Sequence, residues 1–174
     1  LGLGRDMRLT APELAGRYAA GMTAEGATVL DAGQVGTEQL YYLVGSRNLD
    51  GGLMCTASHN PKAYTGAKLV GEGALALSGD SGIQEVRRYA QSDLPAPDPA
   101  KAGSIESVDV TEGFQQAVLE FVDADKISRS LKIVVDGGNG MAGDMAGPIF
   151  DGLGIELSKH YWVPNGEFPG HEPN

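Results

Sequence analysis

Hydrophobic residues recur every three to four positions along five segments of the chain, a spacing that predicts amphipathic helices. The expected helices cover residues 10–26, 37–44, 81–90, 110–122 and 141–153. Between them lie short apolar runs with the length of buried strands. The expected strands cover residues 1–4, 27–30, 51–55, 66–70 and 131–135, and a further strand begins at 155–157. This alternation predicts an α/β fold in which a mixed sheet is flanked by helices.

Two local signals refine the first elements. Thr10 and Glu13 have the spacing of a capping box at a helix N-terminus, in which each side chain bonds the backbone of the other. The sequence Asp31-Ala-Gly33 is rich in turn-forming residues. We therefore expect a turn directly after the strand at 27–30.

A proline-rich segment divides the chain. Residues 93–103 contain three prolines in eleven positions, a composition typical of an extended, solvated linker. We therefore predict a first domain over residues 1–97, incomplete at its N-terminus, and the first part of a second domain over residues 104–174. The strand–helix–strand pattern that begins at residue 131 is one βαβ unit, which predicts parallel strands and a right-handed crossover.

The composition is that of an ordinary globular protein, with 41% apolar and 21% charged residues. The formal net charge of −10 disfavours nucleic acid and anionic membranes as partners. No apolar run approaches the ~20 residues of a membrane span, and the first residues lack the features of a signal peptide. Cys55 is the single cysteine, which excludes an intrachain disulfide and favours the reducing cytoplasm.

Both ends of the sequence resemble the interior of a longer protein. The chain begins with Leu1 in what reads as the end of a strand, and residues 170–174 have the composition of a loop. We therefore expect a fragment. A partial domain leaves a sheet edge and part of a core uncovered, so association through these exposed edges is also expected.

The segment Gly52–Pro61 carries the strongest chemical signal. Its apolar run ends in Thr-Ala-Ser-His-Asn-Pro, which places the hydroxyl of Ser58 at the carboxyl end of a strand, where α/β proteins hold their ligands. A serine hydroxyl is a weak nucleophile that needs activation. The nearby candidates for this are His59, Asn60 and Lys68. The alternative is structural: Ser58 caps a helix and His59 packs against the loop.

The run Thr56-Ala-Ser-His-Asn-Pro61, followed by Tyr64-Thr-Gly-Ala-Lys-Leu69, resembles the phosphoserine loop of the α-D-phosphohexomutases. Residues 4–9 resemble the GRDxRxS stretch of this family, although Thr10 takes the serine position. Residues 136–143 resemble the strand, turn and helix that open the family's second domain, and residues 168–174 resemble the loop that follows. The resemblance covers essentially all of the chain.

This resemblance implies an isomerase that transfers a phosphoryl group between C1 and C6 of hexose phosphates, with mannose and glucose as the favoured sugars. Ser58 would carry the phosphoryl group, donate it to a sugar monophosphate and recover the other phosphate of the hexose bisphosphate intermediate. The family also implies Mg²⁺, to which Ser58 would contribute an oxygen. The remaining ligands of the metal are expected beyond Asn174.

The resemblance also implies roles for residues around Ser58. Lys68 matches the family's active-site lysine, an acid or base in catalysis. His59 and Asn60 match residues that shape the loop and approach the phosphoryl group, His59 as a catalytic residue and Asn60 as a phosphate-binding one. Arg5 is expected behind the loop, where it braces the loop together with Asp6 or binds the substrate phosphate.

Parts of the family's pattern lie outside this sequence. The N-terminal motif with its active-site arginine would precede residue 1, and the Asp-rich metal loop and two sugar-recognition domains would follow residue 174. Within the loop, Thr65 and Ala67 also depart from the family's usual residues. We therefore expect this chain to be inactive by itself. Two alternatives stay open: a phosphoglucosamine mutase of the same family, and a non-catalytic module that binds sugar phosphates.

The Gly-rich segment 136–140 admits two interpretations. It forms a tight turn between a strand and a helix, or it cradles a phosphate at the helix N-terminus. The carboxylate of Asp136 would repel a phosphate, and the glycine spacing differs from the dinucleotide-binding fingerprint. The tight turn is therefore the favoured interpretation.

Overall fold

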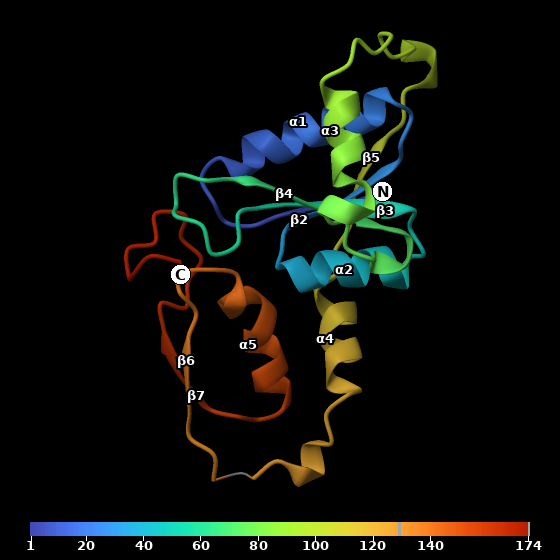
Figure 1. Cartoon of the computed structure of the whole chain (residues 1–174). Coiled ribbons are helices and arrows are strands. Elements are labelled where there is room, and N and C mark those ends of the chain that lie inside the picture. The colour runs from blue at the N-terminus through green and yellow to red at the C-terminus, as the bar shows by residue number, and fades with distance from the viewer. Residues whose placement is uncertain (129, 174) are drawn as a thin grey trace.

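The computed structural model describes residues 1–128 and 130–173, and its first layer is a five-stranded sheet (Figure 1). The strand order is β4–β3–β1–β2–β5. The strands are β1 (Gly2–Arg5), β2 (Val29–Gln34), β3 (Gly51–Thr56), β4 (Gly66–Gly71) and β5 (Ile105–Ser107). Four strands run parallel and β4 runs antiparallel to β3. The expected mixed sheet of an α/β fold is confirmed.

Helices pack on both faces of this sheet. The helices are α1 (Ala11–Ala24), α2 (Thr37–Ser46), α3 (Gln84–Ala90), α4 (Thr111–Leu119) and α5 (Ala142–Gly152). Short 3₁₀ turns at Glu72–Ala74, Pro99–Lys101 and Ala124–Lys126 and a π turn at Gly79–Ile83 join them. Helix α1 covers one face of the sheet and α2 covers the opposite face (Figure 1).

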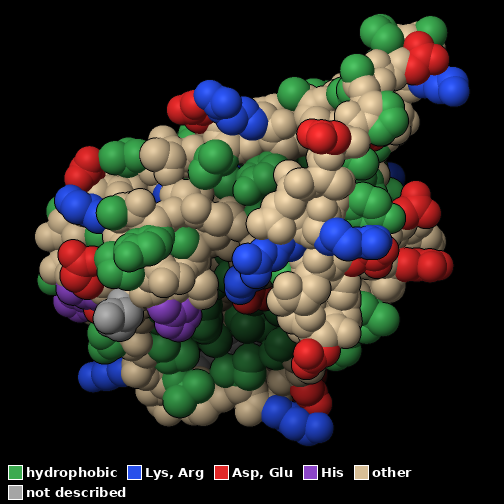
Figure 2. Space-filling model, turned by 45° about the horizontal axis from the view of Figure 1, so that its top comes forward, with side chains coloured by type: hydrophobic (Ala, Val, Ile, Leu, Met, Phe, Trp, Pro, Cys, Tyr) green, Lys and Arg blue, Asp and Glu red, His purple; other side chains and the backbone are tan. Residues whose placement is uncertain are grey.

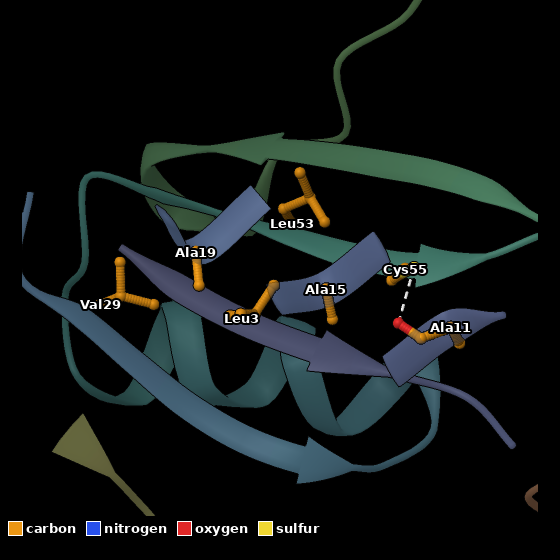
Figure 3. Packing of buried hydrophobic residues seen from close by; sticks show 7 residues of the cluster. All are labelled: Leu3, Ala11, Ala15, Ala19, Val29, Leu53 and Cys55. Carbon is orange, nitrogen blue, oxygen red and sulfur yellow. Dashed lines mark hydrogen bonds between the residues drawn. The ribbon is translucent and has the colours of Figure 1, made fainter. Parts of the chain in front are cut away.

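The core is divided by the sheet because successive side chains of a strand point to opposite faces. Leu53 and Cys55 of β3 face α1, where they join Leu3 and three alanines of the helix (Figure 3). Met54, the residue between them, faces α2 and joins Leu40 and Leu43. All six residues of β3 are buried. Strand β3 is therefore held on both faces, and it fixes the position of the loop that follows it.

The C-terminal part of the chain contains the expected βαβ unit. Strand β6 (Ile133–Asp136) pairs in parallel with β7 (Leu157–His160), and α5 connects them. Figure 1 shows this unit on the side of the first sheet that α2 covers. Asn174, the last residue of the predicted loop motif, lies outside the described residues.

Two local predictions were wrong. Helix α1 begins at Ala11 as expected, but Thr10 has helical torsions and does not cap the helix. Its hydroxyl instead lies 2.6 Å from the hydroxyl of Thr65, so a tertiary contact replaces the local one. The turn expected after residue 30 is also absent among the described residues. Strand β2 continues to Gln34, because Gly33, with a φ of 70°, accommodates an irregularity in its pairing with β1.

Residues 93–98 of the proline-rich segment form no helix or strand and are exposed, as expected of a solvated linker. Beyond it, β5 pairs in parallel with β2, so the first sheet receives its last strand from residues 105–107. The division into domains at residues 97 and 104 stays a prediction. In the described part of the chain, no helix has both the length and the apolar character that crossing a membrane requires.

Candidate active site at the end of strand β3

Ser58 lies in the loop between β3 and β4, on the surface of the molecule. Its φ of 53° places it in the left-handed region, which few residues other than glycine adopt. The backbone nitrogen of Ser58 donates to Oγ1 of Thr56 at 3.1 Å. The chain therefore turns sharply after the buried strand and leaves an accessible hydroxyl at the turn. Unusual backbone conformations of this kind cluster at functional sites.

Arg8 holds the loop of residues 57–65 between β3 and β4, which we call the serine loop. Its side chain is 1% exposed, and its two terminal nitrogens donate to four backbone carbonyls of the loop. Those of Ser58 and Asn60 lie 2.8 and 2.7 Å from Nη2. Those of Pro61 and Tyr64 lie 3.0 and 2.9 Å from Nη1. The planar guanidinium thus fixes the path of the loop across seven residues.

Asp6 balances the buried charge of Arg8. Oδ2 of Asp6 lies 3.4 Å from Nε of Arg8, and Oδ1 accepts from the backbone nitrogen of Arg8 at 3.0 Å. Oδ2 also accepts from the hydroxyl of Thr56 at 2.6 Å. Because an unpaired buried charge is costly, this network makes Asp6, Arg8 and the start of the loop one unit.

Two cavities adjoin Ser58. The smaller, of about 340 Å³, lies between the serine loop and the start of β4. Ser58, Asn60 and Lys68 all line it. Lys68 is exposed and pairs in register with Met54 of β3. The structure therefore brings the predicted nucleophile and the predicted lysine to one cavity, although ten residues separate them in the sequence.

The larger cavity, of about 600 Å³, lies between the two parts of the chain. Ser58 and His59 line it on one side, together with the N-terminus of α2. The Gly-rich turn before α5 and His171 line it on the other side. Figure 2 shows a hollow in the surface of the molecule with hydrophobic side chains in its depth. The serine loop and the βαβ unit thus share a cleft.

The Gly-rich segment forms a tight turn, as favoured. Oδ1 of Asp136 accepts from the backbone nitrogen of Gly138 at 2.8 Å, and both carboxylate oxygens lie 3.2 Å from Nε2 of His171. The hydrogen bond from Gly138 and then that from His171 lower the pKa of Asp136. The backbone carbonyl of Glu172 and then the carboxylate of Asp136 raise the pKa of His171. No sequence pattern pointed to this pair, whose members are 35 residues apart.

Asn139 is a second residue that the sequence did not single out. It is 8% exposed and has a φ of 54°. Its backbone nitrogen donates to the carbonyl of Tyr161 at 2.7 Å, and its Nδ2 donates to that of Val163 at 3.0 Å. Its Oδ1 accepts from the nitrogen of Gly170 at 3.2 Å. An asparagine between glycines in a βα turn, where a left-handed residue is favoured, was the available signal.

The side chains of Asn60 and Arg5 are each engaged in other hydrogen bonds. The side chain of Asn60 donates to the carbonyl of Ala57 at 2.7 Å, so it stabilises the serine loop. Arg5 is at the end of β1, where Nη1 donates to Oε1 of Gln34 at 3.4 Å. In the described part of the chain, Arg5 lines neither cavity next to Ser58. The brace of the loop is therefore Arg8, together with Asp6, rather than Arg5.

The described residues do not form a complete magnesium site. Within residues 1–128 and 130–173, no group of three or more His, Cys, Asp or Glu side chains is placed to hold a metal ion. Mg²⁺ requires an octahedron of oxygen ligands. Ser58 offers one hydroxyl oxygen to such an ion.

Comparison with known proteins agrees with the serine-loop motif. The profile of the family described as phosphoglucomutase/phosphomannomutase, alpha/beta/alpha domain I, matches residues 1–94. Phosphomannomutase from Escherichia coli (strain K12) is 38% identical over 178 residues, which cover 99% of this chain and 39% of that protein. Phosphoglucomutase from Neisseria gonorrhoeae is 35% identical over 175 residues, which cover 100% of this chain and 36% of that protein.

A solved structure shows the same architecture. The crystal structure of a phosphoglucomutase/phosphomannomutase family protein from Burkholderia thailandensis superposes with a TM-score of 0.82 at 33% identity, covering 99% of this chain and 38% of that one. This chain therefore spans less than half the length of the relatives that it matches. The chain belongs to the phosphoglucomutase/phosphomannomutase family, whose domain I its residues 1–94 match.

Proposed function

We propose that this chain forms the phosphoserine-bearing part of a phosphohexomutase, with Ser58 as the residue that carries the phosphoryl group. The observation that supports this most is the position of Ser58. It is exposed at the end of a buried strand, in a left-handed conformation, with its backbone carbonyl bonded to the buried Arg8. A carrier of a phosphoryl group needs both accessibility and a fixed position, because phosphoryl transfer depends mainly on positioning and electrostatics.

The proposed reaction exchanges two bonds to phosphorus. A hydroxyl of the sugar monophosphate attacks the phosphoryl group on Ser58, the bond between phosphorus and Oγ breaks, and a hexose bisphosphate forms. The proton of the attacking hydroxyl passes to a base, and Oγ receives a proton as it leaves. The bisphosphate then returns its other phosphoryl group to Ser58 by the same exchange, so that the phosphate has moved between C1 and C6.

Lys68 is the proposed partner of Ser58. Both residues line the smaller cavity, and an ammonium group there would stabilise the charge of the transferred phosphoryl group or move a proton. His59 and Asn60 are proposed to approach the phosphoryl group from the loop itself. A direct contact between Arg5 and phosphate stays a prediction, since Arg5 is engaged with Gln34.

The charge of the cleft makes positive groups necessary. Asp6, Glu38 and Asp136 line the larger cavity and would repel a dianionic sugar phosphate. His59 and His171 also line this cavity, on opposite sides of it. So do the N-termini of α2 and α5, whose backbone amides favour anions. We propose that these groups and Lys68 offset the repulsion.

Mg²⁺ stays a proposal that rests on membership of the family. A magnesium ion at phosphorylated Ser58 would neutralise charge on the transferred group. The described residues supply one oxygen for it, and the other ligands would come from a later part of the protein. The substrate class, a hexose phosphate, is supported by the names of the relatives, which are phosphomannomutase and phosphoglucomutase.

Transfer of phosphate to the protein tests the proposal directly. The complete protein is incubated with glucose 1,6-bisphosphate or mannose 1,6-bisphosphate, and its intact mass and phosphopeptides are measured. We expect a mass gain of one phosphate that maps to Ser58. A protein that binds the bisphosphate but never gains phosphate would be a non-catalytic sugar-phosphate-binding module. Glucosamine 1,6-bisphosphate as the preferred donor would indicate a phosphoglucosamine mutase.

A further inference from the structure

We propose that residues 165–168 form a strap that holds Arg8, and through it the serine loop, with Phe168 as a positioning residue. The inference rests on the proposed function and deepens it, since it concerns how the loop that carries Ser58 is held. The strap belongs to the C-terminal part of the chain, whereas the loop joins two strands of the first sheet. The proposal means that the serine loop is ordered only when it packs, through Arg8, against a segment more than one hundred residues away in the sequence.

The first contact is between Phe168 and Arg8. The guanidinium carbon of Arg8 lies 5.3 Å from the centroid of the Phe168 ring, within the range of a cation–π interaction. Both side chains are buried, Phe168 being 7% exposed. The terminal nitrogens of Arg8 are already bonded to the serine loop. The ring therefore packs against a guanidinium whose terminal nitrogens hold the loop.

The second contact is between backbones. Gly166 packs so closely on residues 7–9 that an added Cβ would lie 2.7 Å from the carbonyl oxygen of Met7 and 2.9 Å from the nitrogen of Leu9. Only glycine fits at that distance without a shift of one of the two segments. This contact sets the distance between the strap and the peptide units on either side of Arg8.

A third contact joins the strap to the serine loop directly. Nζ of Lys62 lies 3.0 Å from Oε2 of Glu167. Both side chains are exposed, so this pair contributes little by itself. The pair shows that the strap lies next to the serine loop. The strap contacts the loop at Lys62, and it contacts Arg8, which holds the loop.

The strap is a built turn that is anchored in the βαβ unit. The nitrogens of Glu167 and Phe168 donate to Oδ1 and to the carbonyl of Asn165, at 2.9 and 3.0 Å. The nitrogen of Asn165 donates to the carbonyl of Asn139 at 2.8 Å. Phe168 has a φ of 50°, which is rare for a bulky side chain and is kept only where the surroundings impose it.

These contacts form one continuous path. It runs from the turn before α5 through Asn139 to the strap, from Phe168 to Arg8, and from Arg8 to the carbonyl of Ser58. A change in the position of the βαβ unit would therefore reach the phosphoryl carrier through packed, hydrogen-bonded groups.

Hydrogen exchange of the complete protein tests the strap without any reference to activity. The variant Phe168→Leu keeps an apolar side chain but removes the aromatic face over Arg8. We expect the amides of residues 57–64 to exchange about tenfold faster. The matched control is Phe114→Leu, which removes a similarly buried ring that packs on Tyr42 of α2. If both variants leave residues 57–64 equally protected, the proposal is overturned.

Two further measurements separate positioning from general destabilisation. Phe168→Tyr keeps the ring and should restore the protection that Phe168→Leu loses. If Phe168→Leu loses protection and Phe168→Tyr loses it equally, the aromatic face is not the cause and the proposal fails. Gly166→Ala should likewise loosen residues 57–64, because the new Cβ pushes the strap away from residues 7–9.

Steady-state kinetics then connect the strap to the proposed function. In the complete protein, Phe168→Leu should lower kcat about tenfold with a small change in KM, as expected when a reacting group is displaced. Faster exchange at the loop in a protein that never phosphorylates Ser58 would support the strap and overturn the proposed function. Unchanged exchange at the loop in a protein that does phosphorylate Ser58 would support the proposed function and overturn the strap.

Discussion

The guanidinium of Arg8 donates to the backbone carbonyl of Ser58 over a distance of 2.8 Å between Nη2 and the oxygen. The two residues are 50 positions apart in the sequence and come from different strand ends, β1 and β3. The contact holds the main chain of Ser58 and leaves its hydroxyl free for chemistry. A buried arginine thus acts on the site without facing the cleft.

Replacing Arg8 should lower the stability of the fold around the first sheet. Arg8→Met leaves the carboxylate of Asp6 buried without its partner, so we expect the free energy of unfolding to fall by about 3–5 kcal/mol. Urea denaturation measures it. The control is Arg17→Met, which breaks the exposed pair of Arg17 and Glu13 on α1 and should cost less than about 1 kcal/mol. Equal losses in the two variants would contradict the structural role of Arg8.

Replacing Ser58 should remove the phosphoryl carrier and spare the fold. Ser58 is exposed, so we expect Ser58→Ala to change the free energy of unfolding by less than about 0.5 kcal/mol. Incubation of the complete variant with a hexose bisphosphate should give no phosphorylated peptide. A phosphate found at another residue of this variant would show that the nucleophile had been assigned to the wrong side chain.

Lys68 should affect rate more than stability. It is exposed on β4 and shares the smaller cavity with Ser58. In the complete protein we expect Lys68→Ala to lower kcat by about 10²–10⁴, the range for the loss of a positioned acid or base. Lys132→Ala removes an exposed lysine that lines a different cavity and should leave kcat unchanged. Full activity of Lys68→Ala would exclude this lysine from the reaction.

The pair of Asp136 and His171 should make the turn at the cleft sensitive to pH. The pKa of Asp136 is lowered, so its stabilising contribution is present above the ordinary pKa of a carboxyl group and is lost as the pH falls through the lowered value. The pKa of His171 is raised, so its contribution is present below the ordinary pKa of histidine and is lost as the pH rises through the raised value. The pair is therefore fully formed at pH values above the ordinary pKa of a carboxyl group and below the ordinary pKa of histidine.

An NMR titration of the His171 ring measures this coupling. In Asp136→Asn the midpoint should move down, toward the ordinary value for histidine. Part of the increase should remain, because the carbonyl of Glu172 is the larger cause. Asp109→Asn is the matched control, since Asp109 likewise accepts from a backbone nitrogen, that of Thr111. A midpoint that does not move in Asp136→Asn would show that the two side chains are not paired in solution.

Cys55 should react slowly with thiol reagents. It is fully buried between β3 and α1, and this burial, followed by the nearby charge of Asp6, raises the pKa of its thiol (Figure 3). Alkylation at pH 8 should be much slower in the folded protein than in urea, because the thiolate is the reactive form. Mass spectrometry over time measures both rates. Equal rates would place Cys55 at the surface.

The sequence by itself determined most of the elements and the place of the proposed nucleophile, Ser58, whereas strand β5 was not predicted. Helix α2 and strand β3 followed from spacing within ten residues, and the serine loop followed from the point where the apolar run of β3 stops. These features depend on local periodicity, which a sequence displays directly. The resemblance to the family rested on the same local runs.

Tertiary structure decided what supports the proposed nucleophile. Arg8 rather than Arg5 braces the loop, Thr10 bonds Thr65 rather than its own helix, and Asn139 holds the turn that carries Phe168 to Arg8. Each of these contacts joins residues that are far apart in the chain. Their geometry depends on how buried layers pack, and no local pattern of residue types records which of two nearby arginines will point inward.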